Sequence, residues 1–298
     1  MKTQNGFTLL ENEKDVKNWL AKQKVNRTIT RLQVHHMDLP NYTTWEKTDK
    51  KLFSEPHFGR TQSLDSYGKS KWRYSDGHGK YIAQHFNVFP DGKITTGRNL
   101  NSTPIGIRGW NEQAICIEIY GCFDKGRDIM NETQKKAVIY LYAALAKRFN
   151  IPVNTAHIRP HCWFTAGGTY LGKYIPSRSA KTCPGTNFMG FGTSPEGFAK
   201  FIKLVKDHVN GKEEHKKDDD KQEEDSKPST KVKFQIQTLD KLNVRKVADW
   251  DAEPVTTVKK GQILDVVDTV TAKNGNTKMY KLESGLYITA SSKYVKKL

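Results

Sequence analysis

Hydrophobic and polar positions in the first two thirds of the chain follow two different periods. Apolar side chains recur every three or four positions in residues 13–25, in 131–149 and after Ser194, which predicts three amphipathic helices. Ser194 followed by Pro195 is typical of a helix start. Between the helices, segments rich in β-branched and aromatic residues predict strands at 28–37, 81–89, 93–96 and 114–120. This mixture predicts an α/β layer fold.

The last part of the chain has a different pattern. Short apolar segments separated by Gly, Asn and Lys turns predict a small all-β barrel, with strands within 242–245, 255–270, 278–283 and 286–298. Residues 211–230 contain no aromatic or aliphatic side chain, so they bury too little surface to offset the entropy of ordering. We therefore expect two domains, at 1–210 and 231–298, joined by a flexible charged linker at 211–230.

Composition and charge narrow the classes of function. The 298 residues are 36% hydrophobic, enough for a sizeable core, and the net charge of +17 indicates an anionic partner such as nucleic acid, anionic lipid or an acidic wall polymer. No motif for nucleic-acid binding accompanies that charge, so we expect no nucleic-acid partner. No apolar run approaches the ~20 residues of a membrane span, and the first 18 residues lack the apolar segment of a secretory signal.

Candidate chemistry begins with two adjacent histidines in the strand expected at 28–37. Strand alternation places His35 on the polar face with Gln33, and His36 on the apolar face with Val34. Neighbouring residues on a strand point to opposite faces, so the two histidines cannot serve one site. The plain alternative is a core His36 and an exposed His35.

A second candidate is the acidic residue Glu118. Isoleucines fill one face of the strand at 114–120 and leave Glu118 on the other face with Cys116. A lone carboxylate in an interior strand costs free energy unless it is paired. A metal or a nearby Lys would pair it and suit it to general-base catalysis, whereas a salt bridge to Arg98 or Arg108 is the structural alternative.

Later in the chain, His157, His161 and Cys183 are possible metal ligands. Two imidazoles and one thiolate are a sufficient set for tetrahedral zinc and leave a fourth position open, as in catalytic sites. The four cysteines include no CxxC pair and are too few for a disulfide framework, which leaves one free to be a ligand. Spacing alone does not pair His35 with such distant residues, so scattered histidines and a buried cysteine remain the alternative.

Five segments carry a family resemblance. They are QVHHMD around His35, QHFNVFPDGKITTGR at 84–98, NSTPIGIRGWNEQAICIEIYGCFDKG at 101–126, HCWF at 161–164 and KTCPGTNF at 181–188. In this order and spacing they resemble the zinc-dependent N-acetylmuramoyl-L-alanine amidases of the type-2 amidase and peptidoglycan-recognition-protein family. The resemblance covers about residues 25–190 and implies a central mixed β-sheet flanked by helices.

The resemblance also implies a site. His35, His161 and Cys183 match the family's ligands for Zn²⁺, and His157 is the reserve for the second histidine. Glu118 matches the family's catalytic acid/base.

Two further positions qualify that assignment. Lys181 matches the family's lysine that stabilises an oxyanion, whereas Gln84 stands near the position where other members carry a catalytic Tyr. The chain departs from compact relatives in a longer, polar insertion at 40–81 that carries His57 and His78, and that insertion shapes specificity or supplies a further ligand.

The implied reaction is hydrolysis of the amide bond between N-acetylmuramic acid and L-alanine in peptidoglycan. A non-catalytic peptidoglycan-binding protein is the alternative, and Cys183 favours the enzyme because non-catalytic relatives lose the thiolate ligand.

The C-terminal part resembles bacterial SH3-like domains through LNVR at 242–245, KKG at 259–261 and SSKYV at 291–295. That resemblance implies a cell-wall-binding domain, with a packing or spacer domain as the alternative. The whole chain looks like a phage endolysin or an autolysin, with peptidoglycan and anionic wall polymers as partners, and we expect a monomer. Without a signal peptide, it would be made in the host cytoplasm and released to the wall by a holin-type route, or be secreted without a classical signal.

Overall fold

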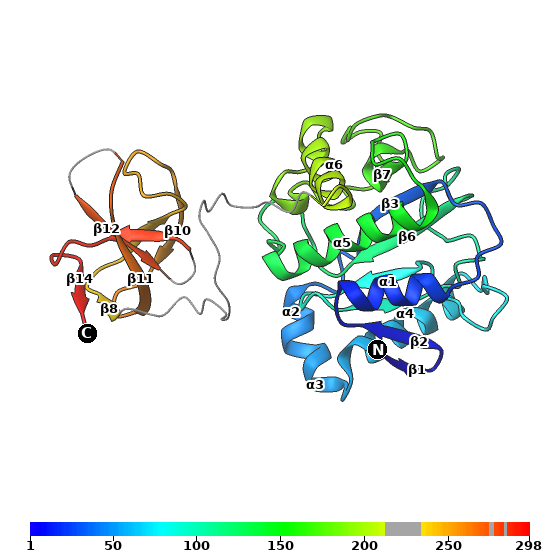
Figure 1. Ribbon diagram of the computed structural model, residues 1–298, viewed down its shortest axis with the longest axis horizontal. Helices are drawn as coiled ribbons and strands as arrows, with labels where there is room; N and C mark the ends of the chain where they lie inside the picture. Colours follow the sequence, from blue (N-terminus) through cyan, green and yellow to red (C-terminus); the bar gives the residue numbers. More distant parts are fainter. Residues whose placement is uncertain (212–233, 274–276, 283–284) are drawn as a thin grey trace. The chain divides into compact units, whose positions relative to one another are not determined.

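The structure, a computed structural model, describes residues 1–211, 234–273, 277–282 and 285–298. The chain divides into two units, Met1–Lys217 and Asp218–Leu298, and each is described by itself (Figure 1). The linker expected at 211–230 lies, apart from Gly211, outside the described residues. Within the described residues, no helix is both long and apolar enough to cross a membrane.

A seven-stranded sheet in the order β1-β2-β5-β4-β6-β3-β7 forms the centre of the first unit (Figure 1). β6 pairs in parallel with β4 and β3, and β3 pairs in parallel with β7, whereas β1, β2 and β5 join by antiparallel pairing. The sheet is therefore mixed, as expected. The strands are β1 (Lys2–Gln4), β2 (Phe7–Leu10), β3 (Arg31–His36), β4 (Phe86–Val88), β5 (Ile94–Thr96), β6 (Ala114–Ile119) and β7 (Ile158–Pro160).

Three amphipathic helices, α1 (Glu13–Lys22), α5 (Glu132–Phe149) and α6 (Pro195–Val209), contribute to the main core with one face of the sheet. α5 contacts both α1 and α6. Each helix begins at a side-chain cap, and the hydroxyl of Ser194 accepts the backbone N–H of Gly197 at the start of α6. The helices predicted from periodicity are thus present, and α1 ends three residues before the expected boundary.

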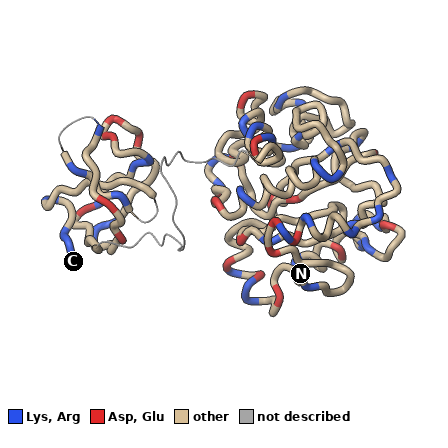
Figure 2. Tube along the Cα trace, viewed as in Figure 1, with Lys and Arg blue, Asp and Glu red and all other residues tan. Residues whose placement is uncertain are grey.

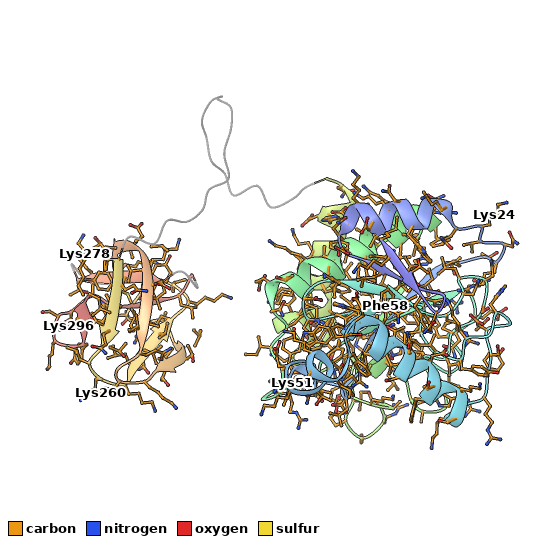
Figure 3. All side chains as sticks on the ribbon, turned by 90° about the horizontal axis from the view of Figure 1, so that it is seen from below. Lys24, Lys51, Phe58, Lys260, Lys278 and Lys296 are labelled. Atoms are coloured by element: carbon orange, nitrogen blue, oxygen red, sulfur yellow. The ribbon has the colours of Figure 1, made fainter. Side chains whose placement is uncertain are left out.

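The insertion at 40–81 forms a group of helices beside the sheet: α2 (Tyr42–Thr44), the π-helix η1 (Trp45–Asp49), α3 (Lys50–Leu52) and α4 (Pro56–Lys71). Phe58 lies on α4 (Figure 3). It packs with Phe7 and Leu9 of β2 in a cluster separate from the main core, which instead receives Leu10. Because strand side chains alternate between faces, α4 covers the face of the sheet opposite α5. The N-terminal hairpin and α4 were not predicted from the sequence.

Two short 3₁₀ helices, η2 (His161–Trp163) and η3 (Phe188–Gly190), complete the first unit. The expected strands formed with shorter bounds: β3 lies within 28–37, and β4 occupies only the end of 81–89.

The second unit is all-β, as expected. Its antiparallel strands run in the order β10-β9-β13-β12-β11-β8-β14 around a core of its own. Lys260, Lys278 and Lys296 lie at its periphery (Figure 3). The strands are β8 (Phe234–Thr238), β9 (Leu242–Arg245), β10 (Pro254–Val258), β11 (Ile263–Thr271), β12 (Lys278–Leu282), β13 (Tyr287–Thr289) and β14 (Val295–Lys297).

Candidate metal centre

Strand register brings two histidines and one acid together at the ends of three parallel strands. His35 of β3 lies directly opposite Glu118 of β6. β3 also pairs with β7 so that Val34 is opposite Pro160, and the next residues along these strands are His35 and His161. Since parallel neighbours lie about 4.8 Å apart, the pairing alone places Glu118, His35 and His161 side by side.

The third candidate ligand arrives on the loop that follows residue 180. The backbone N–H of Cys162 donates to the carbonyl of Cys183 over 2.7 Å, and the N–H of His36 donates to the Cys183 sulfur over 3.4 Å. Gly185 packs against the backbone of Phe123 so closely that a Cβ there would overlap it. These contacts hold the loop against β3 and bring Cys183 to the two histidines.

The spacing of the three donor atoms fits a tetrahedral metal ion. The Nδ1 atoms of His35 and His161 lie 3.2 Å apart, and the sulfur of Cys183 lies 3.6 Å from Nδ1 of His35. Zinc bonds of about 2.05 Å to nitrogen and 2.3 Å to sulfur, at tetrahedral angles, require edges of about 3.35 Å and 3.6 Å. All three donor atoms lie within 4.8 Å of one another. The residues present therefore fit zinc.

Gln33 fixes which nitrogen of His35 faces the other donors. Its amide nitrogen donates to the carbonyl of Trp110 and to the side chain of Asn111, both over 3.0 Å, so its Oε1 points toward His35. That oxygen lies 3.1 Å from Nε2 of His35 and accepts its proton. Nδ1 is then left as an unprotonated donor. Gly106 makes room for this contact, since a Cβ at that position would overlap Oε1 of Gln33.

Burial keeps both histidines neutral and suited to metal binding. It lowers the pKa of His35 well below the usual value, with His161 and Lys181 adding to the effect. Burial likewise lowers the pKa of His161 to about 4. The pKa of the Cys183 thiol is raised well above its usual value by burial and by Glu118. A cation is therefore needed for this sulfur to bind as a thiolate.

Glu118 is the acidic residue of the candidate site. Its Oε1 lies 3.9 Å from Nδ1 of His35, and its buried Oε2 has no hydrogen-bond partner within the described part of the chain. Burial raises the pKa of Glu118 to about 8, and the charge of Lys181 opposes this shift. The salt bridge to Arg98 or Arg108 does not form: Arg98 donates instead to backbone carbonyls, including that of Thr103.

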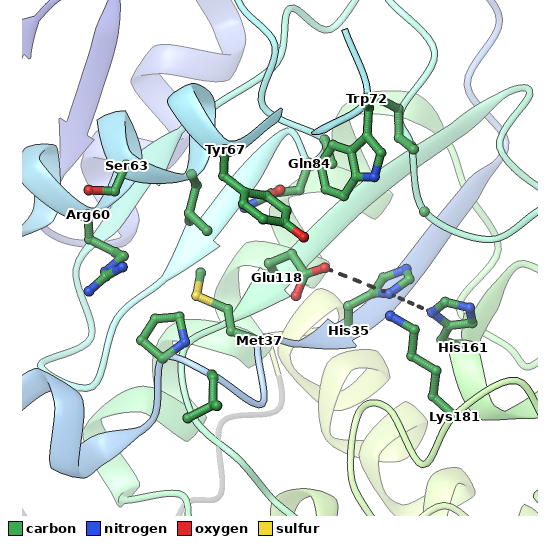
Figure 4. A pocket seen from close by; sticks show the side chains of 16 residues that line it. His35, Met37, Arg60, Ser63, Tyr67, Trp72, Gln84, Glu118, His161 and Lys181 are labelled. Carbon is green, nitrogen blue, oxygen red and sulfur yellow. Dashed lines mark hydrogen bonds and ion pairs between the residues drawn. The ribbon is translucent and has the colours of Figure 1, made fainter. Parts of the chain in front are cut away.

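A pocket of about 530 Å³ opens beside these groups (Figure 4). Glu118, His35, His161 and Lys181 line it, and the insertion supplies one wall. The wall residues from the insertion are Pro40, Arg60, Ser63, Leu64, Tyr67 and Trp72. Figure 4 shows the Lys181 side chain extending beside His35 and His161. The insertion therefore shapes the pocket.

The other candidate histidines do not join this donor group. His157 donates from Nδ1 to the carbonyl of Thr30 over 3.0 Å, His57 pairs with Asp91, and His78 donates its backbone N–H to Asp76.

The alternative of an exposed His35 was wrong, because both adjacent histidines are buried. His35 is covered by the loop that carries Cys183 and by the residue following β7. His36 accepts the backbone N–H of Phe123 at its Nδ1.

Several residues of the site were missed in the sequence. Cys116 forms a second possible donor group with His35 and Glu118, and strand alternation already placed it on the same face as Glu118. Gln33 shared a face with His35 by the same rule, which was the available signal for its role. Arg60 and Tyr67 gave no such signal, because they come from a helix that the pattern did not predict.

Comparison with known proteins finds matches for both parts of the chain. Residues 25–186 match the family described as N-acetylmuramoyl-L-alanine amidase, and residues 229–295 match a domain of unknown function (DUF5776). An endolysin of Bacillus phage SPP1 is 42% identical over 104 residues, which are 34% of this chain and 34% of the relative. The match thus spans about a third of that relative's length.

Two solved structures are similar to part of this chain. The amidase LysC from Clostridium intestinale URNW is 22% identical, with 59% of this chain and 86% of that chain covered and a TM-score of 0.37. Drosophila PGRP-LB is 16% identical, with 55% and 78% covered and a TM-score of 0.39.

The fold is a mixed α/β sheet whose parallel strand ends carry two histidines and a glutamate, and the loop with Cys183 completes a group that could hold a metal ion. The family match extends over more than half of the chain. The chain belongs to the N-acetylmuramoyl-L-alanine amidase family, and the resemblance found in the sequence is confirmed. The SH3-like assignment of the second unit stays a prediction.

Proposed function

We propose that the chain is a zinc-dependent N-acetylmuramoyl-L-alanine amidase that hydrolyses the amide between N-acetylmuramic acid and L-alanine in bacterial peptidoglycan. The observation that carries this proposal is the spacing of the His35, His161 and Cys183 donors, which fits zinc, beside an unpartnered carboxylate oxygen of Glu118. Family membership supports the substrate class. The phage relative supports a role as a lytic enzyme of the cell wall.

In this proposal each residue has one task. His35, His161 and Cys183 hold the ion, which when bound supplies Lewis-acid chemistry that polarises a carbonyl and makes water more acidic. Glu118 accepts a proton from the attacking water at its free oxygen and returns it to the nitrogen of the leaving L-alanine. Lys181 places its ammonium beside the carbonyl oxygen as negative charge develops there.

The proposal extends to the whole chain. Residues 1–210 are the proposed catalytic domain, 211–230 a charged linker and 231–298 an SH3-like domain that binds the cell wall. The separate core of the second unit supports an independent binding domain. A monomeric state remains a prediction of the same proposal.

The test is mass spectrometry of the fragments that the whole chain releases from purified peptidoglycan, with and without a chelator. We expect intact glycan strands and free peptides that begin with L-alanine, only without chelator. Cys183→Ser should lose both bound zinc and turnover, whereas Glu118→Ala should keep the zinc and lose turnover by about 10²- to 10⁴-fold.

Three results would contradict the proposal. Cleavage between sugars or within the peptide would assign a different reaction to the site. Cleavage that survives the chelator would remove the metal from it. Wall binding by a wild-type chain that releases no fragments would favour the non-catalytic alternative.

A further inference from the structure

Arg60 of α4 lines the same pocket and is held from behind by a buried acid. Its Nε donates to Oδ2 of Asp49 over 2.9 Å, and its Nη2 donates to Oδ1 over 2.5 Å. The Asp49 side chain is fully buried, whereas 18% of the Arg60 side chain is exposed. This two-bond fork fixes the plane of the guanidinium.

A third residue completes the support. The hydroxyl of Tyr120, which follows β6, donates to Oδ2 of Asp49 over 2.8 Å. The Tyr120 ring packs against Trp45 and Phe89, with ring centroids 5.5 and 5.7 Å away. The hydrogen bond to Asp49 raises the pKa of Arg60 even though burial opposes it. Residues of the insertion and of the central sheet thus jointly fix the position of this guanidinium.

Stability alone is a weak reason for such a network. Burying a charged pair costs desolvation free energy, and apolar residues of similar volume often stabilise a fold as well. The hydrogen bonds leave part of Arg60 available: a guanidinium has five N–H donors, and Asp49 takes one from Nε and one from Nη2. Among the described residues, no acceptor binds Nη1. Nη1 and Nη2 therefore keep an outward-facing pair of donors.

The position of Arg60 in the pocket determines which part of a bound molecule its free N–H donors can reach. Figure 4 shows Arg60 and Ser63 at the end of the pocket away from His161 and Lys181, with Glu118 between the two ends. Asp49 does not line the pocket, so the pocket presents the cation and not its counter-charge.

Resting on the proposed function, we propose that Arg60 binds a carboxylate of the substrate's peptide. A carboxylate matches the remaining donor pair in both charge and geometry, whereas a carboxamide offers one oxygen and no charge. With the scissile amide beside Glu118, the peptide then runs from the metal centre toward α4, and the sugar lies on the other side. Arg60 is a specificity determinant, and Asp49 and Tyr120 position it.

The test uses two matched pairs of muramyl tripeptides with the sequence L-Ala–γ-D-Glu–L-Lys. One pair differs only in a free or amidated α-carboxyl on the second residue, and the other pair only in a free or amidated C-terminus. Binding is measured by titration calorimetry to the full chain carrying Glu118→Gln, so that no turnover is needed. In one pair, amidation should weaken binding by about 10- to 100-fold. When Arg60→Met is added to the same chain, the ratio of the two dissociation constants in that pair, amidated to free, should fall below about 3.

Variants of the network separate this role from a purely structural one. Arg60→Met leaves Asp49 buried without its partner, so the double variant Asp49→Asn/Arg60→Met removes both charges and should show the same loss of discrimination. Tyr120→Phe keeps Arg60 but removes one hydrogen bond that positions it, so the ratio of dissociation constants should fall only in part. Lys71→Met removes a charge from the exposed end of the same helix, outside the pocket lining, and should leave the ratio unchanged.

Each result decides the inference. Equal binding of both members in both pairs, or discrimination that persists without Arg60, would overturn it. Discrimination that depends on Arg60 in a chain that releases no L-alanine peptides would support Arg60 and contradict the proposed reaction. A chain that binds none of the four tripeptides would overturn both.

Discussion

At the scale of single residues, the candidate centre depends on how His35 is oriented as much as on its presence. Gln33 is held by Trp110 and Asn111 and accepts the proton of His35 at Nε2, so Nδ1 is left unprotonated beside the other two candidate ligands. Partners that orient a ligand in this way contribute to metal affinity although they never touch the ion.

Gln33→Leu should therefore weaken zinc binding by about 10- to 100-fold while the unit stays folded. The measurement is competition with a chromophoric zinc chelator, and circular dichroism is the control for folding. Gly106→Ala should have a similar effect, because its Cβ would displace Oε1 of Gln33. Unchanged zinc affinity in both variants would mean that the orientation of His35 is set by something other than Gln33.

The sequence indicated which residues face the candidate site, but it did not indicate how deeply they are buried. Alternation along a strand correctly separated His35 from His36 and put Glu118 on the face opposite the isoleucines. It did not foresee that His35 is buried, since the covering loop comes from about 150 positions later in the chain. Only the family resemblance brought His161 and Cys183 to His35, because a parallel register is not visible in one strand's sequence.

At the scale of elements, the predictable parts were those with a clear period. α5 and α6 carry an apolar stripe and a side-chain cap, and both were predicted close to their bounds. α4 was missed because polar side chains make several of its contacts, beside the apolar contact of Phe58. The carboxylate of Asp65 accepts the backbone N–H groups of Tyr81 and Ile82 over 2.6 and 2.8 Å, and the hydroxyls of Thr61 and Thr95 are 2.7 Å apart.

The loop after α4 depends on one buried carboxylate, and this dependence predicts how stability varies with pH. Asp76 accepts backbone N–H groups of His78 over 2.8 Å and of Lys80 and Asn99 over 3.0 Å each. Burial alone would raise the pKa of Asp76, but these hydrogen bonds bring it below its usual value. A lowered pKa means that ionised Asp76 stabilises the fold above its unfolded pKa of about 3.9, and that this stability is lost as pH falls through the folded pKa.

Asp76→Asn should therefore unfold at lower urea concentration than the wild type near pH 7, and the difference should narrow as pH falls below about 4. Urea titrations followed by tryptophan fluorescence at several pH values measure it. A difference that stays constant down to pH 3 would show that the hydrogen bonds matter and the charge does not.

At the scale of the whole molecule, the two units have separate cores and separate family matches. The sequence predicted this division from a change of period and from the polar stretch between the units. What the second unit binds could not be read in the same way, because its turns and strands determine a fold without a marked site. Its proposed partner therefore rests on the SH3-like resemblance, on the chain's charge and on the substrate proposed for the first unit.

Attachment to the cell wall through charge should depend on salt concentration. The chain carries a net charge of +17, and Lys and Arg occur throughout both units (Figure 2). Attraction to an anionic wall polymer is screened as the Debye length falls from about 10 Å at 0.1 M salt to about 3 Å at 1 M. Co-sedimentation of the full chain with purified cell walls should decrease over this range, while cleavage of a soluble muramyl tripeptide should change far less.

The fragment 1–210 is the matched comparison. With only one binding site it loses the gain in effective concentration that a second tethered site provides, so it should sediment less at every salt concentration while still cleaving the soluble tripeptide. Equal sedimentation of the fragment and the full chain would mean that residues 231–298 do not bind the wall. Sedimentation that is unchanged at 1 M salt, but requires those residues, would mean that recognition depends on shape and hydrogen bonding. The excess of positive charge would then serve some step other than attachment.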